Sequence, residues 1–227
     1  IKLFGEPVVF DEEAPQETRF LQLFNRRHFP FVLFVAAIWT CQVIPMFAIY
    51  TFGPQIVGLL GLGVGKSAAL GNVVISLCFM LGCIPPMFWL NSAGRRPLLI
   101  GSFVMMTLAL AVLGLVPDMG AWLVVLAFAV YAFFSGGPGN LQWLYPNELF
   151  PTDIRASAVG VIMSLSRIGT IISTWALPVF ITKYGINSVM LMGAGISLIG
   201  LLISIAFAPE TRGLTLAQTS QMTIRTK

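Results

Sequence analysis

One arginine lies inside a long apolar run. Arg167 lies in segment 156–182, about 16 Å from the expected start of its helix at about 1.5 Å per residue. That depth is near the centre of a bilayer, where a charged side chain is costly and normally faces a cavity or a partner. The interiors of the chain's apolar runs contain no acidic residue. Arg167 is therefore a candidate to bind an anionic substrate. The alternatives are an ion pair with an acid outside this chain and a side chain that extends to the interface.

Uncharged polar side chains in two other apolar runs form a second group of candidates. Gln42 lies shortly before a proline, whereas Asn140 ends the stretch 136–140, Gly-Gly-Pro-Gly-Asn, where we expect a break in the helix, and Gln142 follows it. Prolines in membrane helices free backbone groups, and such sites are tolerated where neighbouring groups or a cavity re-satisfy them. These three amides, with Trp143 as an aromatic wall, are candidates for a substrate cavity. Hydrogen bonding between helices is the alternative for the amides, and an interfacial position is the alternative for Trp143.

Opposite charges gather at the short polar junctions between the apolar runs. The residues concerned are Arg95, Arg96, Glu148, Arg155, Glu210 and Arg212. Partly exposed ion pairs contribute about 1 kcal/mol or less each, so several together would hold these junctions to one another and still allow them to separate. The alternative is that the arginines fix the topology and contact lipid headgroups.

The composition places these junctions in a membrane protein. Hydrophobic residues make up 57% of the chain and charged residues 10%, with a mean hydropathy of +0.88, whereas soluble domains carry about a quarter charged residues. We therefore expect an all-α, polytopic membrane protein with six runs long enough to span a bilayer. A linker at 1–28 and a polar tail at 209–227 flank the spans, which are expected at about 29–52, 67–90, 97–116, 121–145, 156–182 and 185–208.

Basic residues in the junctions predict the orientation. If the chain crosses six times, both ends and the second and fourth junctions share one side. That side holds most of the basic residues, and the other side holds Lys66 and Lys183. The positive-inside rule then places both ends of this chain in the cytoplasm.

The sequence gives no indication of an enzyme. It shows no nucleophile with a neighbouring acid and base, no metal-ligand spacing and no nucleotide loop, so we expect neither catalysis nor a cofactor or metal. Cys41, Cys78 and Cys83 lie in apolar runs and are expected to be packing residues. The net charge of +4 comes from scattered basic residues and does not indicate nucleic-acid binding. Because the chain begins at Ile1 with a polar stretch and no leader, we expect it to be part of a longer polypeptide.

Three motifs at the junctions resemble one family. Gly94-Arg95-Arg96, Glu148-Leu-Phe-Pro-x-x-x-Arg155 and Pro209-Glu-Thr-Arg-Gly213 are similar, in this order, to signatures of the major facilitator superfamily, in its sugar-porter and organic-ion branches. The resemblance implies the C-terminal half of a twelve-helix transporter, whose N-terminal half is the partner of this chain. It also implies alternating access around a site between the halves, with the junction charges closing the cytoplasmic gate.

The departures from the family pattern bear on the substrate. The loop aspartate expected before the paired arginines is Asn91, and the sugar-type Gly-Pro-x-Pro-Trp is Gly139-Asn-Leu-Gln-Trp143. These changes disfavour a hexose, while Arg167 favours a small polar or anionic metabolite. The resemblance extends to inner-membrane metabolite transporters of enteric bacteria. We expect transport to be coupled to protons, with the proton-binding acid in the other half, and we expect this half alone to be inactive because the cavity needs both halves. A sugar uniporter or symporter and a non-transporting receptor are the alternatives.

Overall fold

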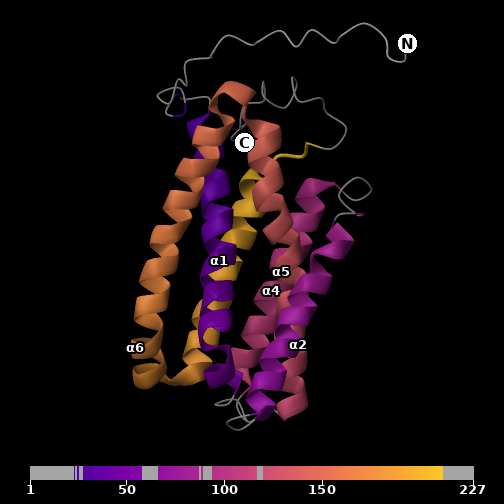
Figure 1. Ribbon diagram of the computed structural model, residues 1–227, viewed down its shortest axis with the longest axis vertical. Helices are drawn as coiled ribbons and strands as arrows, with labels where there is room; N and C mark the ends of the chain where they lie inside the picture. Colours follow the sequence, from indigo (N-terminus) through magenta and orange to yellow (C-terminus); the bar gives the residue numbers. More distant parts are fainter. Residues whose placement is uncertain are drawn as a thin grey trace, which may run out of the picture.

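The computed structural model describes residues 23, 25, 28–57, 66–86, 88, 94–116 and 120–211. These residues form helices and turns, with no strand among them, in keeping with the all-α prediction. The helices lie side by side with nearly parallel axes (Figure 1). They are α1 (Phe29–Val57), α2 (Lys66–Gly82), α4 (Arg95–Leu115), α5 (Ala121–Leu149) and α6 (Thr152–Phe207).

Helix α6 is long enough for two membrane passes. Its 56 residues would be about 84 Å long if straight, far more than the roughly 30 Å of a hydrocarbon core. It turns back at Gly185, whose φ of 78° and ψ of 168° belong to a region that is essentially open to glycine alone. The resulting arms, 152–184 and 186–207, meet at the lower end of the view in Figure 1 and cover the spans expected on either side of the turn.

Four of the described helices are long and apolar enough to cross a membrane, namely α1, α4, α5 and α6. A shorter apolar helical stretch, Val73–Pro86, overlaps α2 and lies inside the span expected at 67–90. The junction between α5 and α6 is reduced to Phe150 and Pro151, so the polar stretch that follows the fourth expected span is mostly helical.

Helix α5 is continuous where the sequence predicts a break. It runs from Ala121 to Leu149 through Pro138 and Pro146, so the break expected at 136–140 is wrong. The glycines there serve close packing instead, because a Cβ on Gly136 would collide with the backbone of Gly82 in α2. Membrane helices commonly use small residues to bring their backbones together in this way.

The crossing of α2 and α5 gives a direct prediction. We expect Gly136→Ala to destabilise the full-length protein by about 2 kcal/mol, since overpacking against a backbone that cannot move typically costs about 1–3 kcal/mol. The thermal unfolding midpoint in detergent measures the effect. Gly101→Ala is the matched control, because nothing lies within 4 Å of a Cβ added there. Equal midpoints for the two variants would show that the crossing tolerates a methyl group.

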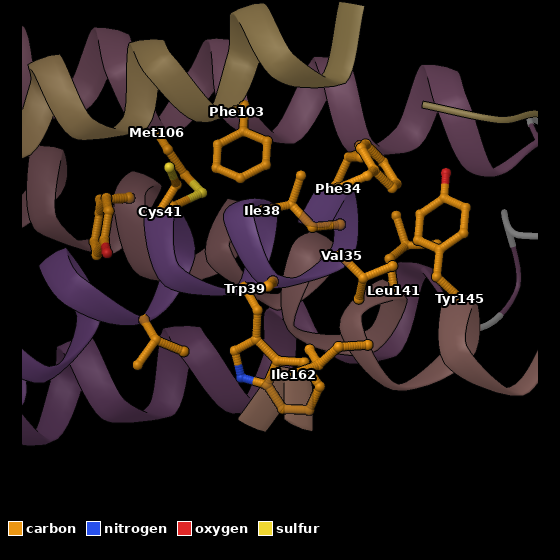
Figure 2. Close-up of a cluster of buried hydrophobic side chains, with 14 of the residues drawn as sticks. Phe34, Val35, Ile38, Trp39, Cys41, Phe103, Met106, Leu141, Tyr145 and Ile162 are labelled. Atoms are coloured by element: carbon orange, nitrogen blue, oxygen red, sulfur yellow. The ribbon is translucent and has the colours of Figure 1, made fainter. Parts of the chain in front are cut away.

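Helix α1 packs against α6, α5 and α2 and contains the candidate residue Gln42. Figure 2 shows Trp39 beside Ile162 of α6, and Phe34 facing Tyr145 of α5. The Phe34 and Tyr145 rings meet edge to face with centroids 5.6 Å apart. Since these side chains are buried, their packing fixes the rotation of α1 and so determines which of its residues face α5 and which face α6.

Candidate functional site

Two tryptophans join α1 and α5 at the edge of the bundle. The rings of Trp39 and Trp143 meet edge to face with centroids 4.9 Å apart. Trp39 is buried at 2% exposure, whereas Trp143 is 48% exposed. Edge-to-face aromatic pairs are favourable beyond their area of contact. The buried ring therefore holds Trp143 on a face that the described part of the chain leaves uncovered.

Gln42 lies deeper on the same pair of helices. Its side chain is buried, and its Nε2 donates to Ser135 Oγ of α5 at 3.1 Å and to Met46 Sδ at 3.4 Å. Gln42 Oε1 is buried and has no hydrogen-bond partner among the described residues. A buried acceptor without a partner is uncommon in proteins, so this carbonyl is a candidate contact for a bound molecule.

Arg167 is exposed near the middle of the first arm of α6. Its guanidinium carbon lies 5.4 Å from the centroid of the Phe47 ring of α1, within the range of a cation–π contact. No ion pair of Arg167 is found among the described residues. The structure therefore holds a cation at mid-span on a surface that lipid, the other half of the protein or a substrate must cover.

The remaining two amides differ in their surroundings. Asn140 Nδ2 donates to the carbonyl of Cys83, just beyond α2, at 2.8 Å, so this amide ties α5 to the proline-containing end of the second span. Gln142 is half-buried, and its Oε1 is buried without a hydrogen-bond partner in the described residues. Asn140 thus makes an interhelical bond of the kind expected of a packing residue, and the Gln142 carbonyl is free to accept a bond.

The junction charges meet at the end of the bundle where α4 begins and α5 ends, here called the charged end. Arg95 Nη2 lies 2.8 Å from Glu148 Oε1, and the two side chains are 12% and 14% exposed. Thr211 Oγ1 donates to the other Glu148 oxygen, and Tyr145 Oη donates to the Pro209 carbonyl at 3.2 Å. The segment after α6 is thereby fixed to α5, and through Glu148 to α4.

Glu210 caps helix α4. Its two carboxylate oxygens accept the backbone N–H groups of Arg95 and Arg96 at 3.0 and 3.1 Å, where the helix dipole favours an anion. Gly94 precedes the helix with φ 94°, and a Cβ there would lie 2.7 Å from Glu210 Oε2. Glycine is therefore required at position 94 for two reasons: its backbone conformation and the close approach of the Glu210 carboxylate.

The other charges at this end bind backbone carbonyls. Arg96 Nη2 donates to Ile205 O at 2.7 Å, and Arg155 Nε donates to Phe150 O at 3.2 Å. The ion pair that Glu148 forms among the described residues is therefore with Arg95 and not with Arg155. Arg212 and Asn91 lie outside the described residues.

The structure thus places the predicted residues in two groups. Arg95, Arg96, Glu148 and Glu210 meet at the charged end, while Gln42, Trp143 and Arg167 contact residues of α1 or α5 within the spans. Sequence reasoning missed Trp39, Ser135 and Thr211. No local signal could have identified Ser135 or Thr211, because each acts on a residue far away in the chain.

Comparison with known proteins decides the family. The family model described as "Sugar (and other) transporter" matches residues 8–223. The chain belongs to this family, within the major facilitator superfamily. The prediction made from the three junction motifs is confirmed.

Named relatives agree with this assignment. The chain is 89% identical over 225 residues to YaaU of Escherichia coli (strain K12), which is named as a metabolite transport protein. It is 30% identical over 217 residues to YgcS of the same organism, an inner membrane metabolite transport protein. The matches cover 99% and 95% of this chain but 51% and 48% of the relatives, so the chain spans about half their length.

A solved structure shows the same fold. The proton:xylose symporter XylE, bound to 6-bromo-6-deoxy-D-glucose, superposes with a TM-score of 0.72 at 20% identity, over 88% of this chain and 43% of that one. This likeness confirms the all-α membrane fold. The family and its relatives are transporters by name, in accord with the expectation that the chain is not an enzyme.

Proposed function

We propose that the protein to which this chain belongs is a secondary active transporter of a small polar or anionic metabolite, working by alternating access. This chain would be its C-terminal half, and the substrate would bind between the halves near the bilayer midplane. Family membership supports the transport activity. The names of the relatives support a metabolite as substrate.

Arg167 is the residue that favours an anionic substrate. It is exposed near the middle of the first α6 arm, and its contact within this half is the Phe47 ring. A mid-membrane cation normally faces a water-filled cavity or an opposite charge. A carboxylate on the substrate would supply that charge, with Trp143 as an aromatic wall and Gln42 and Gln142 as hydrogen-bonding groups. Asn140, bonded to the Cys83 carbonyl, would hold α5 in place beside them.

The charged end would be the cytoplasmic gate. The basic residues of the first segment, the junctions and the tail place it on the cytoplasmic side by the positive-inside rule. Arg95, Arg96, Glu148, Arg155 and Glu210, with Arg212 beyond the described residues, would close it in the outward-open state. Both ends of this chain would then lie in the cytoplasm, with the six spans in the inner membrane.

Proton coupling would depend on the other half. The interiors of the apolar runs of this chain contain no Asp or Glu, so the group that binds the proton would come from the N-terminal half. Proteoliposomes containing the full-length protein are expected to accumulate a radiolabelled carboxylate when an inward proton gradient is imposed, with saturable kinetics. Equal uptake with and without the gradient would contradict coupling, and absence of saturable uptake of the carboxylate would contradict an anionic substrate.

A sugar is the second candidate substrate. The chain is 29% identical over 195 residues to the glucose transporter GlcP of Staphylococcus epidermidis, although the match covers 44% of that protein. The same proteoliposomes separate the two substrates, because a sugar transporter would accumulate neutral glucose or xylose and leave carboxylates outside.

The isolated half is expected to be inactive. Residues 1–227 supply one wall of the proposed cavity, and transport between two rocking halves requires both. Counterflow in proteoliposomes made with residues 1–227 should therefore stay at the level of empty liposomes. Full-length protein at the same molar ratio is the control. Substrate-specific counterflow by residues 1–227 alone would show that the site is complete within this chain.

A further inference from the structure

An apolar cavity lies between α1, α4 and the two arms of α6. Its volume is about 70 Å³, and its lining includes Pro45, Leu110, Leu177 and Val189. Among the described residues, α5 contributes none to this lining. The cavity is therefore separate from the face of α1 and α5 that holds Trp143.

The side chains of this cavity offer a bound molecule no hydrogen bond. Ser173 supplies the one polar side chain in the described lining, and its hydroxyl already donates to the Thr170 carbonyl of its own helix at 2.9 Å. A buried water needs about two to four polar partners, whereas apolar cavities stay dry and take up apolar molecules. Water and a polar metabolite are both poor occupants for this reason, so an occupant of the cavity must be apolar.

The cavity opens on an apolar face of the second α6 arm. Met192 is 44% exposed, whereas the other lining residues are buried or half-buried, so the opening lies beside Met192. The exposed residues of this arm, 186–207, are all apolar or glycine, whereas the first arm exposes Arg167. Charged residues in membrane spans face the bundle interior or a water-filled cavity, and an exposed face that lacks them lies against lipid. Hydrocarbon chains are therefore the molecules present at the opening.

The lining lies at the depth of the lipid chains of one leaflet. Its α6 residues fall within 173–180 and 189–196, on either side of the turn at Gly185. These positions are about 6–18 Å from the turn along the helix axes, at 1.5 Å per residue. Since the hydrocarbon core is about 30 Å thick, this range corresponds to the leaflet far from the charged end.

We propose that this cavity is a binding site for the end of a phospholipid acyl chain from that leaflet. An empty cavity destabilises a protein in proportion to its volume, because the atoms that line it lose dispersion contacts. An acyl chain restores those contacts and breaks no hydrogen bond. It packs beside Pro45, which lacks the N–H of a regular helix bond, and so supports α1 against both arms of α6. The site is independent of the substrate that the protein transports.

Photolabelling of the full-length protein in phospholipid nanodiscs tests the proposal. The probe is a phosphatidylethanolamine with a diazirine at the end of one acyl chain, and peptide mass spectrometry locates the label. Leu177 and Val189 line the cavity but are 7% and 6% exposed, so lipid around the protein reaches them only by entering it. Their labelling should exceed that of Leu113, a buried α4 residue outside the lining, by at least about tenfold, the order expected for filling a cavity of this volume.

A matched pair of variants separates entry into the cavity from general contact with lipid. Ala176 belongs to the lining, and Ala176→Phe would fill the cavity with a ring. Labelling of Val189 should then fall about tenfold, to the level of Leu113. Ala129 is half-buried in α5, outside the lining, and Ala129→Phe should leave the labelling of Val189 unchanged.

Two results would overturn the assignment. Labelling of Leu177 and Val189 no higher than that of Leu113 in the unaltered protein would show that no acyl chain enters the cavity, whether or not the variants fold. Unchanged labelling of Val189 in Ala176→Phe would show that the probe reaches this residue by another route. Because neither result depends on substrate uptake, the proposed transport function stands or falls separately.

Discussion

Replacing Arg167 by alanine in the full-length protein should lower its affinity for the carboxylate that we propose it transports by about a hundredfold or more. Truncating one partner of a desolvated, hydrogen-bonded charge pair typically costs about 2–5 kcal/mol, which corresponds to roughly thirtyfold to several thousandfold in affinity. Arg167 is exposed in this half and contacts the Phe47 ring, so expression and thermal stability should change little. Isothermal titration with the transported carboxylate measures the loss.

Lys183→Ala is the matched control for charge. Lys183 is an exposed cation near the turn at Gly185, away from the middle of the arm, and its removal should leave affinity unchanged. Unaltered affinity in Arg167→Ala would contradict the binding role. A lower thermal midpoint would then indicate a pair with an acid of the other half, and an unchanged midpoint a side chain that extends to the interface.

Replacing Glu148 by glutamine should open the proposed cytoplasmic gate. Arg95 and Glu148 are 12% and 14% exposed, so their pair is screened less than a surface pair. A hydrogen bond to a charged group contributes about 1.5–3 kcal/mol, and a loss of about 2 kcal/mol would shift the equilibrium roughly thirtyfold toward the inward-open state. Thr211 could still donate to the glutamine carbonyl, so the tail should remain attached.

The shift is measured by the rate at which an impermeant thiol reagent, added from the cytoplasmic side, modifies a cysteine introduced into the proposed cavity. Asp153→Asn is the control, because it removes another carboxylate near the charged end without disturbing the Arg95–Glu148 pair. It should leave the rate within about twofold of the unaltered protein, since Asp153 forms no ion pair among the described residues. A Glu148→Gln rate equal to that of the control would contradict the gating role.

The fold could be predicted from the sequence because it depends on composition and on short motifs. Long apolar runs allow few structures in lipid other than helices, and the three junction motifs lie within contiguous segments. The continuity of α5 could not be predicted in this way. Gly136 suggests a break when only its neighbours in the sequence are considered. Its role in close packing is recognised only once the structure places the α2 backbone against it.

The candidate site was predictable only in part, for a similar reason. Arg167 and Glu148 stand out because charges are rare in an apolar chain. The partners that orient the site residues do not stand out, because a serine or a tryptophan in a membrane helix is ordinary. Ser135 gains its importance from a contact with Gln42 across 93 positions in the sequence. The cap that Glu210 forms on α4 likewise joins segments that are distant in the chain.

The most direct test of alternating access is the water accessibility of the α6 face that carries Arg167. Ser164 lies one turn before Arg167 and is exposed, whereas Leu202 is an exposed apolar residue on the second arm. Cysteines at these two positions, in full-length protein with Cys41, Cys78 and Cys83 replaced by alanine, would be treated with an impermeant maleimide from each side of the membrane. Alternating access predicts that Ser164→Cys reacts from both sides and that Leu202→Cys, facing lipid, reacts from neither. Absence of reaction at Ser164→Cys from both sides would contradict an alternating-access cavity at this face.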